Sequence, residues 1–306
     1  MILENMLLKK NRVLSAWYSV LGRTLSTKYQ ALSIAIFLFF TLIPLVSGLI
    51  YAVLYSLGIA GALSQGFTFE HWRAVFSSSI FINSLGVSIL IASISLIISI
   101  IIALFFTIKI TQNGVHHSSF IIQNFYLPLS IPPIIAAFLT FQFLSNSGIV
   151  SRIFNKIGFI QNAESFPELV NDALYVGVIV TQVFMTFPFL TLLFLNFHKT
   201  FKINELSQLS KTLGATDRQI QCRVTIPILL QKARPNIVLL FIVLMSSYEI
   251  PLLLGRQSPM MLSVLIGQKF RKFNLLDIPQ AYAMTVIYAV LVMGLVALFF
   301  TKKEEI

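Results

Sequence analysis

The sequence predicts an all-α membrane protein, a polytopic bundle of six transmembrane helices with a cytoplasmic loop before the fifth. Hydrophobic residues make up 57% of the chain and charged residues only 11%, whereas soluble domains carry roughly 25% charged residues. Several apolar runs exceed the ~20 residues with which an α-helix crosses a bilayer, while a barrel strand needs only about ten. This composition excludes a soluble nucleotide-binding enzyme, a disordered chain and a disulfide scaffold.

The hydrophobic segments that are long enough to cross a membrane divide the chain into three parts. The segments are Ala31–Leu57, Ile80–Ile108, Phe120–Leu144, Ala173–Phe197, Pro235–Leu254 and Ala281–Thr301. We therefore expect an N-terminal arm over residues 1–30, one membrane domain over residues 31–301 and a tail over residues 302–306. The arm is basic and aromatic, which fits either an interfacial helix or a partly ordered tail.

The basic residues predict the orientation of the chain. There are 22 Lys and Arg against 11 Asp and Glu, a net charge of +11, which in a membrane chain indicates contact with anionic lipid rather than with nucleic acid. Most of the basic residues lie in the arm, in the loops over residues 109–119 and 198–234, and in the tail. Both termini are therefore expected in the cytoplasm. The predicted outer loop between the fifth and sixth spans does not follow this distribution of positive charge, because it contains Arg256, Lys269, Arg271 and Lys272.

Motifs for catalysis or metal binding are missing from the sequence. It has no phosphate-binding loop, no His-Glu-x-x-His motif and a single cysteine, Cys222. His116 and His117 have no acidic neighbours, so solvated surface is a better interpretation of them than a metal site. The protein is therefore not expected to be an enzyme, and any energy that it uses comes from a gradient or from another chain.

The polar stretch over residues 205–227 predicts two short helices that lie parallel to the bilayer. Asn204 is a candidate N-cap for the first helix, in which Leu206, Leu209 and Leu213 share one face. An alternative is that the stretch is a solvated linker that packs on its own bundle.

The turn between these two helices has residues suited to it. Gly214 is expected to end the first helix because glycine adopts a positive φ without a Cβ penalty. Thr216 is a candidate N-cap for the second helix, and Asp217 is favourable in its first turn. Pro227 is expected to end that helix.

This stretch resembles the EAA loop of binding-protein-dependent ABC importer permeases, which have a MetI-like fold. The family pattern is E-A-A, three residues, a glycine, and a proline thirteen residues later. Gly214, Ala215 and Pro227 match it, but Gln208 stands where a glutamate is usual, and Glu205 lies one turn earlier. Further blocks extend the resemblance over about residues 67–300.

The resemblance implies a subunit that couples solute import to a separate ATPase in a bacterial inner membrane. The loop would dock on that ATPase, which uses ATP and Mg²⁺, whereas this chain would bind no cofactor. The other implied partners are a second permease, identical or not, and an external solute-binding protein. The implied coupling residues are Glu205, Gln208, Thr212, Leu213, Gly214, Ala215, Thr216, Asp217 and Pro227.

A second candidate site lies in the predicted fifth span. Glu249 is costly inside a membrane, and Ser246, Ser247 and Tyr248 add polar groups beside it. The carboxylate either lines the solute path or lies near the outer interface, capped by a helix or by a basic residue of the last loop. This region resembles spermidine/putrescine-type permeases, which implies a polyamine-like cation, although the same subgroup includes transporters of iron(III) and thiamine.

Isolated polar residues elsewhere in the spans, Gln182 among them, are interpreted as forming hydrogen bonds between helices.

Two other functions fit the composition. An ion-gradient-driven transporter would favour repeated halves and ion-binding residues on several helices. A non-transporting membrane scaffold would have a dispensable Glu249.

Overall fold

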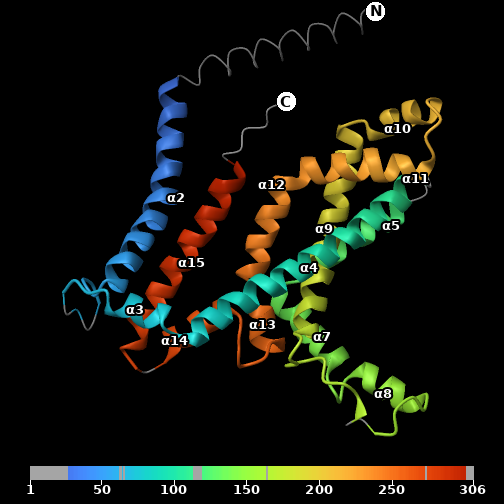
Figure 1. Ribbon diagram of the computed structural model, residues 1–306. Coiled ribbons are helices and arrows are strands. Elements are labelled where there is room, and N and C mark those ends of the chain that lie inside the picture. Colours follow the sequence, from blue (N-terminus) through green and yellow to red (C-terminus); the bar gives the residue numbers. More distant parts are fainter. Residues whose placement is uncertain are drawn as a thin grey trace, which may run out of the picture.

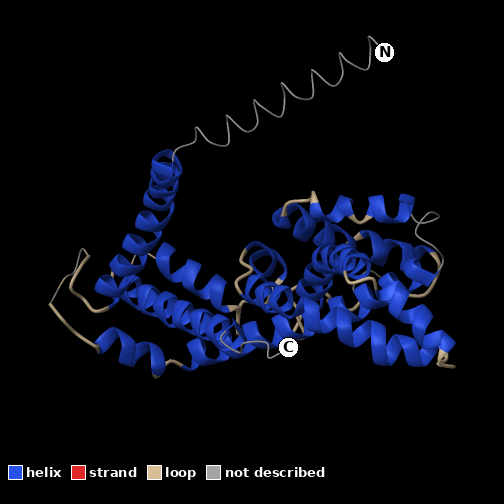
Figure 2. Ribbon diagram, turned by 90° about the horizontal axis from the view of Figure 1, so that it is seen from above, coloured by secondary structure: helices blue, strands red, loops and turns tan. Residues whose placement is uncertain are grey.

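The computed structural model describes residues 27–61, 64, 66–112, 119–162, 165–272 and 274–300. Every regular element in these ranges is helical (Figure 2). In chain order the elements are α2 (Thr27–Ser56), α3 (Glu70–Phe76), α4 (Ser79–Gln112), α5 (Ser119–Asn124), α6 (Tyr126–Leu129), α7 (Pro133–Leu144), α8 (Ile149–Lys156), α9 (Val176–Thr200), α10 (Ile203–Thr212), α11 (Asp217–Ile220), the π-helical turn η3 (Gln221–Thr225), α12 (Ile226–Met245), α13 (Glu249–Leu254), α14 (Leu262–Arg271) and α15 (Asp277–Phe300). The arm up to residue 26, the His116–His117 pair and the tail lie outside the described residues.

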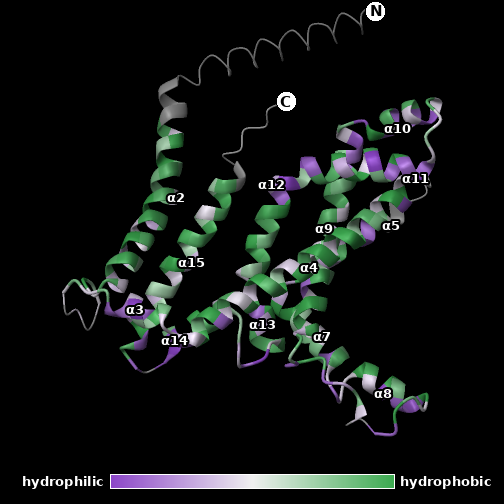
Figure 3. Cartoon of the chain, in the orientation of Figure 1, coloured by the Kyte–Doolittle hydropathy of each residue, from purple (hydrophilic) through white to green (hydrophobic). Residues whose placement is uncertain are grey.

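Six helical stretches are long and apolar enough to cross a membrane, as the sequence predicts. They are Leu32–Ser56, Ser79–Gln112, Pro133–Lys156, Val176–Thr200, Asp217–Met245 and Asp277–Leu298. The protein is therefore an all-α polytopic membrane protein. Figure 3 shows hydrophobic residues along the spans and polar residues gathered at the two ends.

The third predicted span is not one continuous helix. The segment predicted over Phe120–Leu144 consists of α5, α6 and α7, with a non-helical stretch at residues 130–132. Pro132 is extended, with a φ of −59° and a ψ of 144°. Consecutive prolines at positions 132 and 133 explain the break, because each lacks an N–H donor and disfavours a helical residue before it.

The fifth predicted span begins earlier and ends earlier than expected. Helix runs without interruption from Asp217 to Met245 through η3, so the prediction that Pro227 ends the second loop helix is wrong. Pro227 lies inside this continuous helix, two residues after the π-helical turn η3; such turns occur as single irregular turns within α-helices. The helix stops after Met245, and α13 starts at Glu249.

Pro251 explains this second break. Its ring would clash with the carbonyl four residues earlier, which belongs to Ser247. That carbonyl instead accepts a hydrogen bond of 2.5 Å from the hydroxyl of Ser263 in α14. The helix is thus completely broken before α13, and a neighbouring helix supplies the partner for the freed carbonyl.

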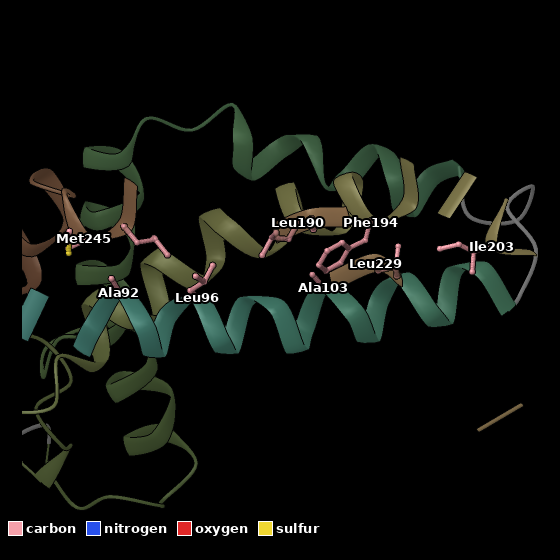
Figure 4. Packing of buried hydrophobic residues seen from close by; sticks show 10 residues of the cluster. Ala92, Leu96, Ala103, Leu190, Phe194, Ile203, Leu229 and Met245 are labelled. Carbon is pink, nitrogen blue, oxygen red and sulfur yellow. The ribbon is translucent and has the colours of Figure 1, made fainter. Parts of the chain in front are cut away.

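The main hydrophobic cluster lies between α4, α9 and α12, and α10 also contributes to it. Leu190 and Phe194 of α9 lie against Ala103 of α4 and Leu229 of α12 (Figure 4). The buried side of α4 is rich in small residues: Ser84, Ser88, Ala92, Ser95, Ser99 and Ala103. Small side chains let helices approach closely in a membrane, which accounts for the long contact of α4 with α9.

The two ends of the bundle carry different elements (Figure 1). The start of α2 and the end of α15 lie at the same end as α10 and α11, whereas α3, α8 and α14 lie at the opposite end. We call these the α10 end and the α8 end. The predicted coupling loop and the predicted outer loops are therefore on opposite sides of the hydrophobic layer.

Candidate functional site

The turn between α10 and α11 is a Schellman motif centred on Gly214. The N–H of Gly214 donates to the Lys211 carbonyl at 2.9 Å, and the N–H of Ala215 donates to the Ser210 carbonyl at 3.0 Å. Gly214 has a φ of +85°, and no heavy atom lies within 4 Å of the position that a Cβ would take. Glycine is favoured here by its backbone conformation alone.

The predicted cap of the second loop helix is confirmed, and it is more complete than predicted. Thr216 and Gln219 form a capping box: the Gln219 N–H donates to the Thr216 hydroxyl at 3.4 Å, and the Thr216 N–H donates to the Gln219 side-chain oxygen at 2.9 Å. The Thr-x-x-Gln spacing carried this signal in the sequence. Asp217 lies in the first turn and pairs with Lys211 at 2.8 Å, which bridges the two helices.

The predicted cap of the first loop helix is wrong. Helix α10 begins at Ile203, after Lys202 in a left-handed conformation, and no side chain caps it. Ile203 is fully buried in the main cluster, so burial of this side chain, rather than Asn204, determines where the helix begins. Glu205 forms an exposed ion pair of 3.4 Å with Lys202, and such pairs contribute little.

The apolar face of α10 does not pack on the bundle. Leu206, Leu209 and Leu213 expose 44%, 64% and 82% of their surface. Among the described residues, the loop packs on its own bundle through Ile203 and Ile220, but it does not bury these three leucines there. Gln208 and Thr212 are exposed on the same helix, and Ala215 is half-buried.

Two hollows border this loop. One, of about 360 Å³, lies between α10 and the ends of α4 and α9, with Gln208, Lys211, Asp217 and His198 in its lining. The other, of about 320 Å³, is lined by Leu213, Gly214, Ala215 and Val224 among others. The loop is thus an exposed ridge with a polar hollow on one side and a smaller hollow at its glycine turn.

All four predicted path residues lie together in one cavity of about 540 Å³. Its lining is Leu129, Pro133, Gln182, Met185, Thr186, Phe189, Leu240, Val243, Leu244, Ser246, Ser247, Tyr248, Glu249 and Ile250. Both helix breaks border the cavity, since Leu129 and Pro133 flank the first and Ser246 and Ser247 form the second. Interrupted helices at a cavity are how membrane proteins expose backbone polar groups to a solute.

Glu249 lies at the start of α13, exposed, and not inside a continuous span. No described residue forms an ion pair with it, so the predicted alternative of a basic partner from the last loop is not what the structure has. Lys269 instead pairs with Asp277, and the Arg271 guanidinium lies 5.8 Å from the centre of the Tyr248 ring. The same ring packs against Gly267, where a Cβ would come within 2.7 Å of it.

Gln182 is a cavity residue that the sequence indicated only as a hydrogen-bonding residue. That interpretation is confirmed, because its side-chain nitrogen donates to the Leu244 carbonyl at 3.2 Å and joins α9 to the end of α12. Its place in the cavity had no sequence signal, since it depends on where the fifth span breaks. Among the described residues, no group of three His, Cys, Asp or Glu side chains is placed to hold a metal ion.

Comparison with solved structures identifies the fold. The chain is similar to a chain of a bacterial alginate ABC transporter in complex with an alginate pentasaccharide-bound periplasmic protein, with a TM-score of 0.68 and 19% identity over 92% of this chain and 94% of that one. It is also similar to a chain of a bacterial ABC transporter involved in the import of alginate, with a TM-score of 0.68 and 18% identity over 94% of this chain and 100% of that one. No protein-family model and no curated protein sequence matches the chain. At these identities the likeness concerns architecture: the protein has the fold of these two transporter chains.

Proposed function

We propose that this protein is a transmembrane permease subunit of a binding-protein-dependent, ATP-driven importer in a bacterial inner membrane. Two independent observations support the proposal. The fold is shared along nearly the whole chain with chains of ABC transporters, one of them in complex with a periplasmic protein. An exposed leucine ridge also ends at a left-handed glycine, where the EAA-like pattern falls in the sequence.

The exposed ridge on α10 is the single observation that carries the coupling role. Three neighbouring leucines in water cost free energy, and a partner that covers them recovers roughly 25 cal/mol per Å² of buried apolar surface. In this proposal the partner is an ATPase that hydrolyses ATP with Mg²⁺. The permease itself needs no cofactor and catalyses no reaction.

Movement of the ridge would reach the spans through Ile203. This residue starts α10 and is fully buried against the cluster formed by α4, α9 and α12. Because such a core is close-packed, a displaced α10 moves its neighbours rather than deforming alone. Closure of the ATPase would then rock these helices and alternate the side on which the cavity opens.

The remaining parts of the proposal follow from this direction of coupling. The α10 end and both termini face the cytoplasm, and the α8 end faces the binding protein. A second permease, identical or not, completes the solute path. The cavity with Glu249 accepts a small cation, of which a polyamine is the proposed kind.

Co-purification tests the coupling role. Leu213→Ser in the full-length chain should reduce recovery of the ATPase roughly tenfold or more, since one buried leucine at an interface contributes about 1.5–3 kcal/mol. Leu174→Ser is the matched control, because Leu174 is 74% exposed but lies two residues before α9, at the end of α9 that is far from α10. Solute uptake should also stop when the ATPase loses its catalytic residue.

Other outcomes point to other functions. Uptake that continues without ATP hydrolysis would indicate an ion-gradient-driven transporter. An ATPase that binds through α10 while uptake is absent would indicate a scaffold. Equal recovery of the ATPase with Leu213→Ser and with wild type would contradict the proposed docking surface.

A further inference from the structure

Another hollow of the protein is an apolar groove of about 360 Å³ between α4, α12 and α15. We call it the α12 groove. Its lining is Leu96, Arg234, Ile237, Val238, Phe241 and Leu295. The α12 residues in this lining lie three or four positions apart, so they share one face of that helix. From Arg234 to Phe241 the groove follows about 10 Å of α12, because each helical residue adds about 1.5 Å.

Arg234 is the one charged residue in the described lining, and it is exposed. The lining surface is almost entirely apolar, so Arg234 contributes its aliphatic stem to the wall, and its guanidinium lies at the edge of the groove. No described residue forms an ion pair or a hydrogen bond with this guanidinium. The ammonium of Lys232, by contrast, lies over the ring of Phe201 at 5.2 Å. Arg234 therefore has a fork of N–H donors that is free to bind an anion.

The charge and the apolar wall follow each other along the helix over residues 217–245. Residues 217–234 include several charged side chains, whereas residues 235–245 include none. Figure 1 shows that this helix runs across the α10 end before it turns toward the α8 end. Pro235, the proline inside α12, accounts for such a bend. The α12 groove thus has its charge at the α10 end, and its wall extends from there into the hydrophobic layer.

We propose that the α12 groove binds an anionic phospholipid, whose phosphate contacts Arg234 while one acyl chain lies in the groove. A phospholipid carries its phosphate at the membrane surface and its chains inward, in the same order as the charge and the apolar wall. Basic pockets between membrane helices bind lipid headgroups by this combination. A helix of a second permease could also cover the wall, but an apolar wall does not call for an unpaired guanidinium at its edge. The inference goes beyond the proposed transport function and does not depend on the solute.

Native mass spectrometry of the delipidated full-length chain in detergent tests the role of Arg234. The probes are dioleoyl-phosphatidylglycerol and dioleoyl-phosphatidylcholine, which share their acyl chains and phosphate but differ in net charge. Wild type should bind the first more tightly. Arg234→Met should raise the Kd of phosphatidylglycerol about tenfold, as expected for a hydrogen bond to a charged group. It should raise that of phosphatidylcholine less, because the choline carries a compensating positive charge.

Arg218→Met is the matched control for the charge. Arg218 is exposed on the same continuous helix and does not line the groove, so this variant should bind both lipids as wild type does. Equal weakening by the two variants would mean that lipid responds only to the net charge of the chain, and would overturn the site. Equal weakening of both lipids by Arg234→Met would overturn the preference for an anionic lipid.

A second pair of variants tests the place of the acyl chain. Leu295→Trp adds bulk inside the groove and should weaken phosphatidylglycerol binding without any change of charge. Leu298→Trp adds the same bulk at a position that is 70% exposed on the same helix and outside the lining, so it should bind as wild type does. Glycerophosphoglycerol, the headgroup without chains, should not compete with the lipid.

The remaining outcomes would overturn the proposal. Full competition by glycerophosphoglycerol, or unchanged binding with Leu295→Trp, would mean that the groove does not hold the acyl chain. Equal binding of the two lipids by wild type would overturn the ligand class. An oligomer that binds no lipid and that Leu295→Trp dissociates would assign the groove to a second copy of this chain.

Discussion

The main-chain N–H of Leu262 donates a hydrogen bond of 2.7 Å to the side-chain hydroxyl of Ser88, 174 residues away in sequence. Leu262 begins α14, and its N–H is one of the donors that a helix start leaves without an intrahelical partner. Both residues are fully buried. A serine of α4 therefore takes the place of a cap for α14 and holds that helix beside the cavity.

Ser88→Ala should destabilise the protein through this bond. The substitution leaves the buried N–H of Leu262 without an acceptor, which costs about 1–3 kcal/mol. Ser93→Ala is the control, because the Ser93 hydroxyl bonds only the Ile89 carbonyl of its own helix. Thermal unfolding of the purified full-length chain should show a lower midpoint for Ser88→Ala than for Ser93→Ala. Identical midpoints would contradict this role of Ser88.

Lys269 belongs to the outer loop whose basic residues oppose the predicted orientation of the chain. It forms an ion pair with Asp277, which neutralises part of that positive charge. The two side chains are 2.9 Å apart and only 15% and 17% exposed, and Lys269 also donates to Gln280 at 2.7 Å. Removing one member leaves the other buried and unpaired, so Lys269→Met should lower stability by about 1–3 kcal/mol.

Lys272→Met is the control for that prediction, since Lys272 is exposed and no described residue pairs with it. The measurement is again thermal unfolding of the full chain. The double variant Lys269→Met/Asp277→Asn should recover part of the loss, because it removes both charges. A double variant less stable than Lys269→Met would show that the pair is not the cause.

Hydropathy alone was enough to predict most of the membrane spans from the sequence. The second span was predicted at Ile80–Ile108 and is Ser79–Gln112, and the fourth was predicted at Ala173–Phe197 and is Val176–Thr200. These ends follow from how far apolar residues extend along the chain. The end of the first loop helix at Gly214 also depends only on nearby residues, and the structure ends the helix where the sequence predicts.

The two helix breaks at the cavity were only partly predictable. Pro132 and Pro133 were visible, but prolines also occur inside unbroken helices here, as Pro188 does in α9. A break persists only where the freed backbone groups find partners, such as Ser263 for the Ser247 carbonyl. That partner lies on another helix, so its position depends on tertiary packing. The assembly of Gln182 with Glu249 follows from the same packing and was not available from sequence.

Burial raises the pKa of Tyr175. The nearby charge of Arg256 lowers this pKa and that of Asp172 raises it, and both effects are smaller than that of burial. A phenol whose pKa is raised in the folded state makes its full contribution to stability below about pH 10, the pKa that it has in the unfolded state. This contribution to stability is lost as the pH rises through the pKa of the folded state. The unfolding midpoint of wild type should therefore fall more between about pH 9 and 11 than that of Tyr175→Phe. Tyr126→Phe removes an exposed phenol and should behave as wild type.

Gly214 has a structural twin at the α8 end, which makes its proposed role testable. After α8, the N–H of Gly158 donates to the Asn155 carbonyl at 3.0 Å and that of Phe159 to the Phe154 carbonyl at 2.9 Å, the same Schellman motif. Gly158 has a φ of +83° and, like Gly214, no heavy atom within 4 Å of the place where a Cβ would lie. A side chain at either glycine has the same backbone cost, about 1–2 kcal/mol.

Gly214→Asp and Gly158→Asp should therefore lower the unfolding midpoint equally and reach similar levels in the membrane. Only Gly214→Asp should abolish uptake and recovery of the ATPase, because only that turn lies beside the exposed leucines of α10. Uptake and ATPase recovery are measured at matched membrane levels of the two variants. Normal uptake with Gly214→Asp would mean that this turn is not docked, and equal loss with Gly158→Asp would assign the effect to the fold rather than to the coupling surface.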